Sequence, residues 1–393
     1  MTIAFVFEIF YPTVNGVITS SVNLAENLIA RGHRVVFIAP KTKDFQEPVI
    51  HGVIPVYYID SSESMIYPGM RTSLPWSRHV VTVLRKEEVD VVHITGPWLL
   101  GAAAIRGARK LDLPIVHTFH TMLHEPTYIK YFAKFNLLVP VFQALAWEYF
   151  KPYIRRSDVM TGPSWYACEE LQEHYPGADI RHISNGVDIS RFESYATFEE
   201  TRRTYPPFNN RSFLFVGRLG AEKSVDQLVS AMHYVVSKLP DAHLFIVGTG
   251  PGQERFENQA RRLKLRKHVH FLGRIPHEEL LRSGLIQHAR AFVTASVTEN
   301  QPMTVIEAIC CGVPIVVPDV RGIRELLDGN GLLFPRADVE SLAARMIRIA
   351  SDDELYGEFR SRSFAFRNRF DGRSVAEEFE GVYRELLEAS RQE

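Results

Sequence analysis

The sequence predicts an α/β protein of two domains, each built on a parallel sheet. Its 393 residues suffice for two domains rather than one. Predicted strands and helices alternate in two series, which a polar and proline-bearing stretch separates. Alternation of this kind indicates parallel strands joined by right-handed crossovers. The hydrophobic fraction of 46% is enough for two large cores.

Composition excludes several classes of protein. Lysine and arginine number 45 against 46 acidic residues, so no basic excess indicates a nucleic acid as partner. The sequence has no run of about 18 uncharged apolar residues, so a transmembrane helix is not expected. It also has no basic region followed by a cleavage site, so a signal peptide is not expected. The three cysteines, Cys168, Cys310 and Cys311, lack both the spacing of a zinc site and the number needed for a disulfide framework. A cytoplasmic location is expected.

The first series opens with a strand, a helix and a second strand. Its predicted strands cover residues 3–7, 35–39, 56–59, 89–94, 114–118, 159–162 and 181–183, and its helices cover 19–30, 78–86 and 99–111. In an open α/β sheet, ligands bind beyond the carboxyl ends of the strands. We expect three loops to meet there: those holding Asn15 and Gly16, Thr95 to Pro97, and His120.

Two residues of these loops are candidates for ligand contact. Gly16 would let the backbone approach a phosphate closely, although an ordinary turn glycine is the likelier interpretation when it is taken alone. His120 ends a predicted strand on the ligand side, whereas His117 is expected to point into the sheet. A lone histidine is usually structural, so position is the argument for His120.

Residues 128–156 are dense in aromatic side chains and carry several basic residues. Tyr128 begins this segment, and its basic residues are Lys130, Lys134, Lys151, Arg155 and Arg156. Amphipathic helices of this composition can lie in a membrane interface, with basic side chains toward anionic lipid. The alternative is that the aromatic residues pack on the sheet of their own domain. Composition leaves both interpretations open.

A domain boundary is predicted near residue 195. Residues 184–188 form a turn-rich link, and residues 193–210 are polar, charged and twice interrupted by proline. We therefore expect domains at residues 1–194 and 195–372, and a C-terminal helix at 373–393 that packs back toward the first domain.

The second series has two loops of interest. Its predicted strands cover residues 212–216, 243–247, 269–272, 291–294, 315–317 and 331–334, and its helices cover 225–238, 253–263 and 278–284 and begin near 303, 339 and 374. Arg218 and Lys223 on one loop could clamp a diphosphate, although solvated surface charge is the better interpretation of an isolated pair. Gly248-x-Gly250-x-Gly252 lacks the spacing of a dinucleotide fingerprint but suits a turn against a base or a phosphate.

Residues 295–318 carry two acids in a strand–loop–helix–strand segment. Glu299 is on the loop and Glu307 is inside the helix, which Pro302 opens as a predicted first residue and Gly312 ends. The free N–H groups of a helix start attract a phosphate, and a carboxylate further along can accept hydrogen bonds from hydroxyls. The segment therefore indicates a nucleotide sugar as ligand. The alternative is a surface loop followed by an exposed helix glutamate.

Together these segments resemble glycosyltransferase family 4, whose members are retaining enzymes with the GT-B fold of two Rossmann-like, doubly wound domains facing across a cleft. The resemblance covers essentially the whole chain, and the order and spacing of its motifs are more specific than any single motif. The motifs are Tyr11-Pro12-x-x-Asn15-Gly16, His117-Thr118-Phe119-His120-Thr121, Ser184-Asn185-Gly186-Val187-Asp188, Val216-Gly217-Arg218-Leu219 with Glu222-Lys223, Gly248-x-Gly250-Pro251, and Glu299 with Glu307.

The resemblance implies an acceptor-binding first domain and a nucleotide-sugar-binding second domain. It implies that Arg218 and Lys223 hold the donor diphosphate and that Glu307 binds the ribose hydroxyls. The implied catalytic residues are His120, Arg218, Lys223 and Glu299. The implied donor-binding residues are Gly16, Arg218, Lys223, Gly250, Arg274, Glu299, Asn300, Gln301, Pro302, Met303, Thr304 and Glu307. Many relatives have glycine and phenylalanine just after the first acid, where this chain has Asn300 to Met303, so it departs from the family pattern at residues expected to hold the donor sugar.

The implied reaction is front-face retention, in which the leaving phosphate oxygen helps to deprotonate the acceptor. Neither a tightly bound cofactor nor a metal is expected. The opening motif and residues 117–128 are similar to the branch that glucosylates diacylglycerol. We therefore expect glucose transfer from UDP-glucose to a lipid such as diacylglycerol at the inner face of the cell membrane. The alternatives are transfer to a soluble or polyprenyl-linked glycan, and a sugar-nucleotide epimerase.

Overall fold

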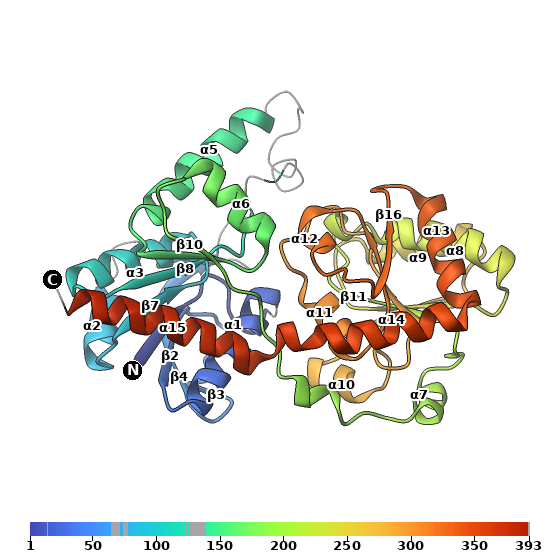
Figure 1. Cartoon of the computed structure of the whole chain (residues 1–393), viewed down its shortest axis with the longest axis horizontal. Helices are drawn as coiled ribbons and strands as arrows, with labels where there is room; N and C mark the ends of the chain where they lie inside the picture. The colour runs from blue at the N-terminus through green and yellow to red at the C-terminus, as the bar shows by residue number, and fades with distance from the viewer. Residues whose placement is uncertain (14, 64–70, 74–77, 123–124, 126–138, 392–393) are drawn as a thin grey trace. The chain divides into compact units, whose positions relative to one another are not determined.

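The computed structural model describes residues 1–393 except 14, 64–70, 74–77, 123–124, 126–138 and 392–393 (Figure 1). The chain forms two compact units. Unit 1 is Met1–Val187 with Gly372–Glu393, and unit 2 is Asp188–Asp371. The division therefore lies earlier in the chain than the predicted boundary at residue 195. Residues just after it belong to unit 2 because Arg191 forms an ion pair with Glu278 there.

Unit 1 contains a sheet of eight strands among the described residues, in the order β10-β9-β8-β7-β1-β2-β4-β3. All pairs are parallel except β3 with β4. The strands are β1 (Thr2–Val6), β2 (Arg34–Pro40), β3 (Val49–Ile50), β4 (Ile54–Ile59), β7 (Val91–Ile94), β8 (Ile115–Thr118), β9 (Val159–Gly162) and β10 (Ile180–His182), beside a separate antiparallel pair, β5 (Ser61–Glu63) and β6 (Arg71–Ser73). The helices are α1 (Gly16–Ala30), α2 (Arg78–Lys86), α3 (Leu99–Lys110), α5 (Val139–Ile154), α6 (Trp165–His174) and α15 (Gly372–Ser390).

Helix α1 begins earlier than predicted. Residues 11–16 were expected to be a loop, but Gly16 is the first residue of the helix. The cause is Asn15, whose side-chain oxygen accepts a hydrogen bond from the Ile18 N–H at 3.0 Å and so caps the helix start. Gly16 therefore lies at the N-terminus of α1, where backbone N–H groups lack helical partners.

Helices cover both faces of the unit 1 sheet, because its central strands are apolar on both faces. On one side, Phe5 and Phe37 pack with α1 and with Phe379 and Tyr383 of α15. On the other side, Ala4 of β1 packs with helices α2 and α3. Continuous apolar runs are typical of parallel strands buried on both faces. This is why the order of strands and helices could be predicted.

A buried polar network ties α15 to three strands of unit 1. The Tyr383 hydroxyl lies 2.6 Å from Nδ1 of His93, whose Nε2 lies 2.7 Å from the Thr118 hydroxyl. That hydroxyl is 2.7 Å from the hydroxyl of Thr161. Burial, with a smaller contribution from His120 and His117, holds the pKa of His93 well below its usual value. The ring is therefore neutral and can donate at one nitrogen while it accepts at the other.

Unit 2 contains a parallel sheet of six strands among the described residues, in the order β13-β12-β11-β14-β15-β16. The strands are β11 (Ser212–Val216), β12 (His243–Val247), β13 (Val269–Gly273), β14 (Ala291–Val293), β15 (Ile315–Pro318) and β16 (Gly331–Phe334). The helices are α7 (Phe198–Thr204), α8 (Val225–Lys238), α9 (Gln253–Arg262), α10 (His277–Arg282), α11 (Met303–Cys310), α12 (Arg321–Arg324), α13 (Val339–Ser351) and α14 (Asp353–Phe366), with the 3-10 turns η2 (Ile189–Phe192), η3 (Ala221–Lys223) and η4 (Arg367–Phe370).

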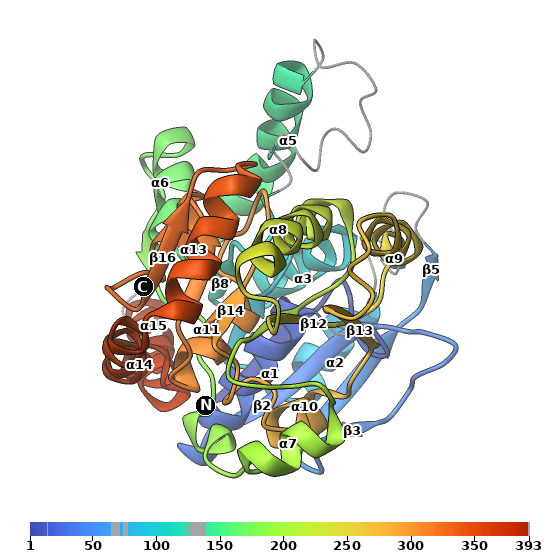
Figure 2. The same cartoon turned by 90° about the vertical axis from the view of Figure 1, so that its right-hand side faces the viewer.

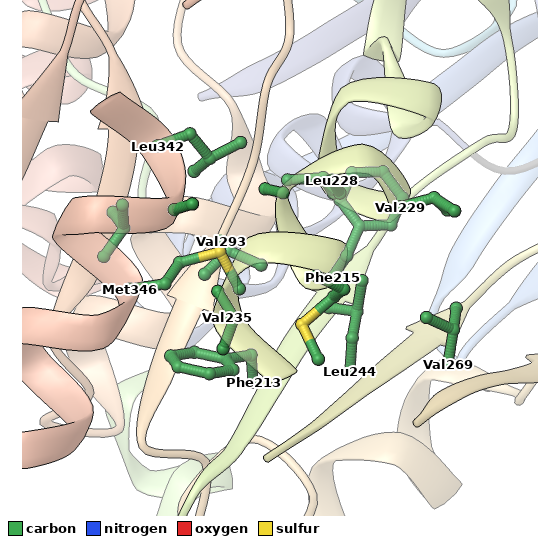
Figure 3. Packing of buried hydrophobic residues seen from close by; sticks show 14 of the residues in the cluster. Phe213, Phe215, Leu228, Val229, Val235, Leu244, Val269, Val293, Leu342 and Met346 are labelled. Carbon is green, nitrogen blue, oxygen red and sulfur yellow. The ribbon is translucent and has the colours of Figure 1, made fainter. Parts of the chain in front are cut away.

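Helices α8 and α13 pack together on one face of this sheet (Figure 2). Leu228 of α8 and Met346 of α13 lie with Phe213 and Leu244 of the strands in one apolar cluster (Figure 3). The cluster fixes the strands from one side. The polar loops at their carboxyl ends therefore start from a rigid base.

Replacing Tyr383 with phenylalanine tests the network that holds α15. The substitution leaves His93 without its hydroxyl partner in a buried site, which is expected to cost about 1–3 kcal/mol of unfolding free energy. Hydrogen exchange should accelerate in Gly372–Ser390 and in strands β7 to β9. Tyr234→Phe is the matched control, because the Tyr234 side chain is exposed. Equal exchange in Tyr383→Phe and the control would contradict a stabilising role for the network.

Candidate functional site

Two loops at the carboxyl ends of neighbouring strands pack closely against each other in unit 2. The Leu219 N–H donates to the Thr249 carbonyl at 3.0 Å, and the Gly252 N–H donates to the Leu219 carbonyl at 2.8 Å. A Cβ on Gly250 would lie 2.7 Å from backbone atoms of Leu219. Gly248 has a φ of +130° and faces the Gly217 carbonyl. The glycines are therefore required by packing between the loops, whether or not a ligand approaches them.

The loop of Glu299 is joined to the loop of Lys223. The Val297 N–H donates to the Glu222 carbonyl at 2.9 Å, and Lys223 forms an ion pair with Glu299. The side chains of Lys223 and Glu299 are 23% and 14% exposed, so water screens the pair only in part. The structure thus brings together two predicted catalytic residues that lie far apart in the sequence.

A third contact supports the Glu299 loop from behind. Gly322 of α12 lies against this loop, and a Cβ on it would be 2.2 Å from the carbonyl oxygens of both Glu299 and Asn300. No larger residue fits there without moving the loop. Sequence analysis missed Gly322. A glycine inside a short segment that follows a buried strand was the signal that could have found it.

Glu307 is buried within α11, and its side chain is 4% exposed. Nε2 of His277 lies 2.9 Å from its Oε1. The alternative of an exposed helix glutamate is therefore wrong. His277 was not identified from the sequence.

The start of α11 lies between the two acids. Pro302 was predicted as the first helical residue, but it is the N-cap, and the helix begins at Met303. Proline has no side-chain acceptor, so no side-chain hydrogen bond caps the helix at this residue. The N–H groups of the first turn are oriented toward the loop that holds Asn300 and Gln301, as the helix direction requires. An anion is favoured at such a position.

The remaining predicted donor residues of unit 2 lie at the same edge of the sheet. Arg218 follows β11 and Arg274 follows β13, and both are exposed. The loops are linked further, because the Gly248 N–H donates to the Gly273 carbonyl at 2.7 Å. The loops after β11, β12, β13 and β14 therefore form one connected polar edge.

His120 lies in a pocket within unit 1. Its polar lining includes Ser20, His93, Thr118 and Asn185. Burial lowers the pKa of His120 to about 4, so its imidazole is neutral near pH 7. A neutral ring can exchange hydrogen bonds with hydroxyls and does not act as a cation. Gly16 is not part of the pocket lining, so the structure does not bring it together with His120 there.

Glu8 is a further polar residue that sequence analysis missed. It follows β1 and accepts hydrogen bonds from the N–H groups of Trp98, Leu100 and Gly101 at 3.1, 3.3 and 2.6 Å. Burial raises its pKa to about 8, although these bonds oppose the rise. Glu8 thus holds the start of α3 and the loop of Thr95 to Pro97 in place. A lone acid directly after an apolar strand was the available signal.

Part of the aromatic and basic segment 128–156, for which membrane contact and internal packing were both left open, lies in α5. Trp147, Phe150 and Ile154 face inward and pack with Phe119 and Met160. The opposite face exposes three apolar side chains one turn apart, Val141, Leu145 and Tyr149. Figure 1 shows α5 standing out from unit 1 at its N-terminal end. One face therefore packs internally while the other remains exposed.

The basic residues of this segment differ in their surroundings. Lys151 forms an ion pair with Glu148 at 2.9 Å, and Arg155 and Arg156 are exposed just after α5. Tyr128, Lys130 and Lys134 lie outside the described residues.

Within the described parts of the chain, no cluster of His, Cys, Asp or Glu has the arrangement of a metal site. The three cysteines are buried and unpaired with one another. Among the same residues, no helix is both long and apolar enough to span a membrane.

Comparison with known proteins defines the class. Residues 14–191 match the family model "Glycosyltransferase Family 4" and residues 198–365 match "Glycosyl transferases group 1". A GDP-mannose-dependent alpha-mannosyltransferase of Mycolicibacterium smegmatis is 31% identical over 93% of both chains. An alpha-monoglucosyldiacylglycerol synthase of Acholeplasma laidlawii is 27% identical over 99% of this chain and 98% of the relative. The solved sucrose-phosphate synthase of Thermosynechococcus elongatus has a TM-score of 0.80 and 21% identity, with 99% of each chain covered.

The chain forms two units with mainly parallel sheets and shares the fold of that synthase. It therefore has the GT-B fold, as the sequence predicts. The protein is therefore a glycosyltransferase. It belongs to glycosyltransferase family 4.

Substituting Gly322 tests whether α12 positions the Glu299 loop. Gly322→Ala should displace the carbonyls of Glu299 and Asn300, because its Cβ would otherwise lie 2.2 Å from them. A displacement near 1 Å can cost about 100-fold in turnover, so we expect kcat to fall roughly 10- to 100-fold. A circular dichroism spectrum and a thermal unfolding midpoint close to those of the wild-type protein would show that the variant folds.

Gly357→Ala is the matched control for this prediction. Gly357 lies in α14 with nothing within 4 Å of its added Cβ, so turnover should be unchanged. Normal turnover in Gly322→Ala would exclude the positioning role.

Proposed function

We propose that this protein transfers a hexose from a nucleoside-diphosphate sugar to the hydroxyl of a membrane lipid such as diacylglycerol, with retention at the anomeric carbon. The observation that carries the donor half of the proposal is the connected polar edge of unit 2. It holds a lysine, a carboxylate and an uncapped helix start within linked loops. Unit 2 would bind the donor and unit 1 the acceptor.

The chemistry proposed for the donor is mainly electrostatic. Lys223 and Arg218 would bind the diphosphate, with the N–H groups of Met303 and Thr304 as further donors. As the bond from the anomeric carbon to the diphosphate breaks, negative charge grows on the leaving group. Preorganised cations and N–H dipoles stabilise charge of this kind, often as the largest catalytic contribution. Glu299 would then accept hydrogen bonds from the sugar hydroxyls.

The acceptor oxygen would form the new bond to the anomeric carbon on the face that the diphosphate leaves. Its proton would pass to an oxygen of the leaving phosphate, so that the step balances without a covalent intermediate. His120, which is neutral near pH 7, would hydrogen-bond to the sugar close to the reacting carbon. Glu307 would accept hydrogen bonds from the ribose hydroxyls.

The exposed face of α5 supports a lipid acceptor. Val141, Leu145 and Tyr149 recur at every fourth position, so they form one apolar stripe along the helix. A stripe of this kind can insert into the headgroup region of a bilayer. Lys151, Arg155 and Arg156 follow along the same segment and suit anionic lipid. The name of the Acholeplasma laidlawii relative, a glucosyldiacylglycerol synthase, agrees with this acceptor class.

Two donors deserve direct comparison. The sequence motifs favour UDP-glucose, whereas the Mycolicibacterium smegmatis relative is named as GDP-mannose-dependent. Asn300 to Met303 differ from the glycine and phenylalanine expected there, so the side chains near the sugar favour neither donor.

The proposal predicts that nucleoside diphosphate is released only when donor and lipid acceptor are both present. The test incubates the full chain with UDP-glucose or GDP-mannose, with and without anionic vesicles that contain diacylglycerol, and measures released diphosphate and glycolipid. Lys223→Ala should reduce release by orders of magnitude, because it removes charge stabilisation from the leaving group. Release that depends on a soluble glycan, or conversion of the donor sugar without release, would overturn the lipid or the transferase assignment respectively.

A second prediction concerns the α5 stripe. Leu145→Gln should weaken binding to anionic vesicles by about tenfold or more, because burying a leucine contributes roughly 1.5–3 kcal/mol. Val53→Gln is the matched control, since Val53 and Leu145 are each 58% exposed in unit 1. Sedimentation with vesicles gives the affinity. If both variants bind like the wild-type protein, α5 does not contact the membrane.

A further inference from the structure

Glu307 occupies a costly position for a carboxylate. Its neighbours in α11, Val305, Ile306, Ala308 and Ile309, are all buried and apolar. A carboxylate in such surroundings is tolerated when hydrogen bonds compensate for its lost hydration. Among the described residues, its one hydrogen-bond partner is His277, with Nε2 at 2.9 Å from Oε1.

His277 comes from a different strand end than Glu307 does. It is the first residue of α10, and it follows β13 after a short turn that begins at Gly273. The Gly273 carbonyl accepts the Gly248 N–H at 2.7 Å, and the Leu280 N–H donates to the Pro276 carbonyl at 2.9 Å. The backbone on both sides of His277 is therefore fixed. Its side chain is 34% exposed, so it lies where the loop edge meets solvent.

The bond has a consequence for the direction of the carboxylate. With Oε1 held by His277, rotation about the last side-chain torsion of Glu307 is restrained. Oε2 is then left as the acceptor for a ligand. A glutamate in an eight-residue helix would otherwise choose among several rotamers, and part of the binding free energy would be spent on ordering it.

We propose that His277 is a positioning residue that orients Glu307 for recognition of the ribose hydroxyls, and that it thereby sets the preference of the site for ribonucleotides over 2′-deoxyribonucleotides. This inference rests on the proposed function, in which Glu307 accepts from the ribose. A site that hydrogen-bonds a hydroxyl through a buried group discriminates strongly against a ligand that lacks it.

The inference is tested with nucleoside diphosphates alone, so it needs no acceptor. Calorimetric titration of the full chain with UDP, GDP and their 2′-deoxy forms gives a ribo-to-deoxy affinity ratio for each base. For the better-bound base, we expect a wild-type ratio of about 10 to 100, the range for a hydrogen bond to a charged group. His277→Ala should lower this ratio to a few-fold, chiefly by weakening the ribonucleotide.

Two variants separate orientation from a general structural effect. His277→Gln can still place an N–H near Oε1, and it should recover much of the ratio. His233→Ala is the matched control, because His233 is exposed on α8, and it should leave the ratio unchanged. A merely structural role for His277 would weaken both nucleotides equally and keep the ratio.

A double-mutant cycle with Glu307→Gln completes the test. If His277 acts through Glu307, adding His277→Ala to Glu307→Gln should change the ratio no further. An additional loss in the double variant, or an unchanged ratio in His277→Ala alone, would overturn the inference. If the wild-type chain binds neither nucleotide, the proposed function itself fails, which is a different outcome from binding without an effect of His277.

Discussion

The ion pair between Lys223 and Glu299 is the interaction on which the candidate site depends. It joins loops that follow two different strands, and both side chains are largely withdrawn from water. A partly buried pair is stable when its surroundings hold the geometry. Here the Val297 to Glu222 hydrogen bond and the packing of Gly322 provide that support. The two charges are therefore held in place by the protein itself. On the proposed function, a phosphate of the donor would replace the carboxylate as the partner of Lys223.

The two acids of the motif differ in environment, and this difference separates their chemistry. Glu299 lies on a loop, and its partner is Lys223, whose ammonium group sits at the end of a flexible side chain. Glu307 lies inside a helix, where its neighbours are apolar and its partner is the imidazole of His277. Glu299 and Glu307 are thus eight positions apart in the sequence, yet the first lies on a loop and the second on a buried face of a helix. On the proposed function, Glu299 would contact the donor sugar from the loop, and the buried Glu307 would contact the ribose hydroxyls from a fixed position.

Much of the fold could be predicted from the sequence, because strands buried on both faces are short apolar runs. Residues 35–39 were predicted as a strand and lie within β2. Local chemistry explains the failures: Asn15 caps α1 before the predicted start, and Pro302 precedes α11 instead of opening it. The charged residues of the candidate site stand in recognisable motifs, and the structure brings Lys223 and Glu299 together, while their roles stay predictions. Glu8, His277 and Gly322 were missed because their importance lies in contacts across the fold, which no spacing in the sequence encodes.

The glycine motifs are explained by packing within the protein. Gly248 and Gly250 are required by the close packing of two loops, so their presence does not by itself identify a ligand. The N–H groups at the start of α11 are equally independent of side-chain identity. On the proposed function, specificity for the sugar would come from side chains carried on this framework, among them Asn300 and Gln301. On the proposed function, the choice of the donor sugar would therefore depend on these side chains and not on the glycines of the framework.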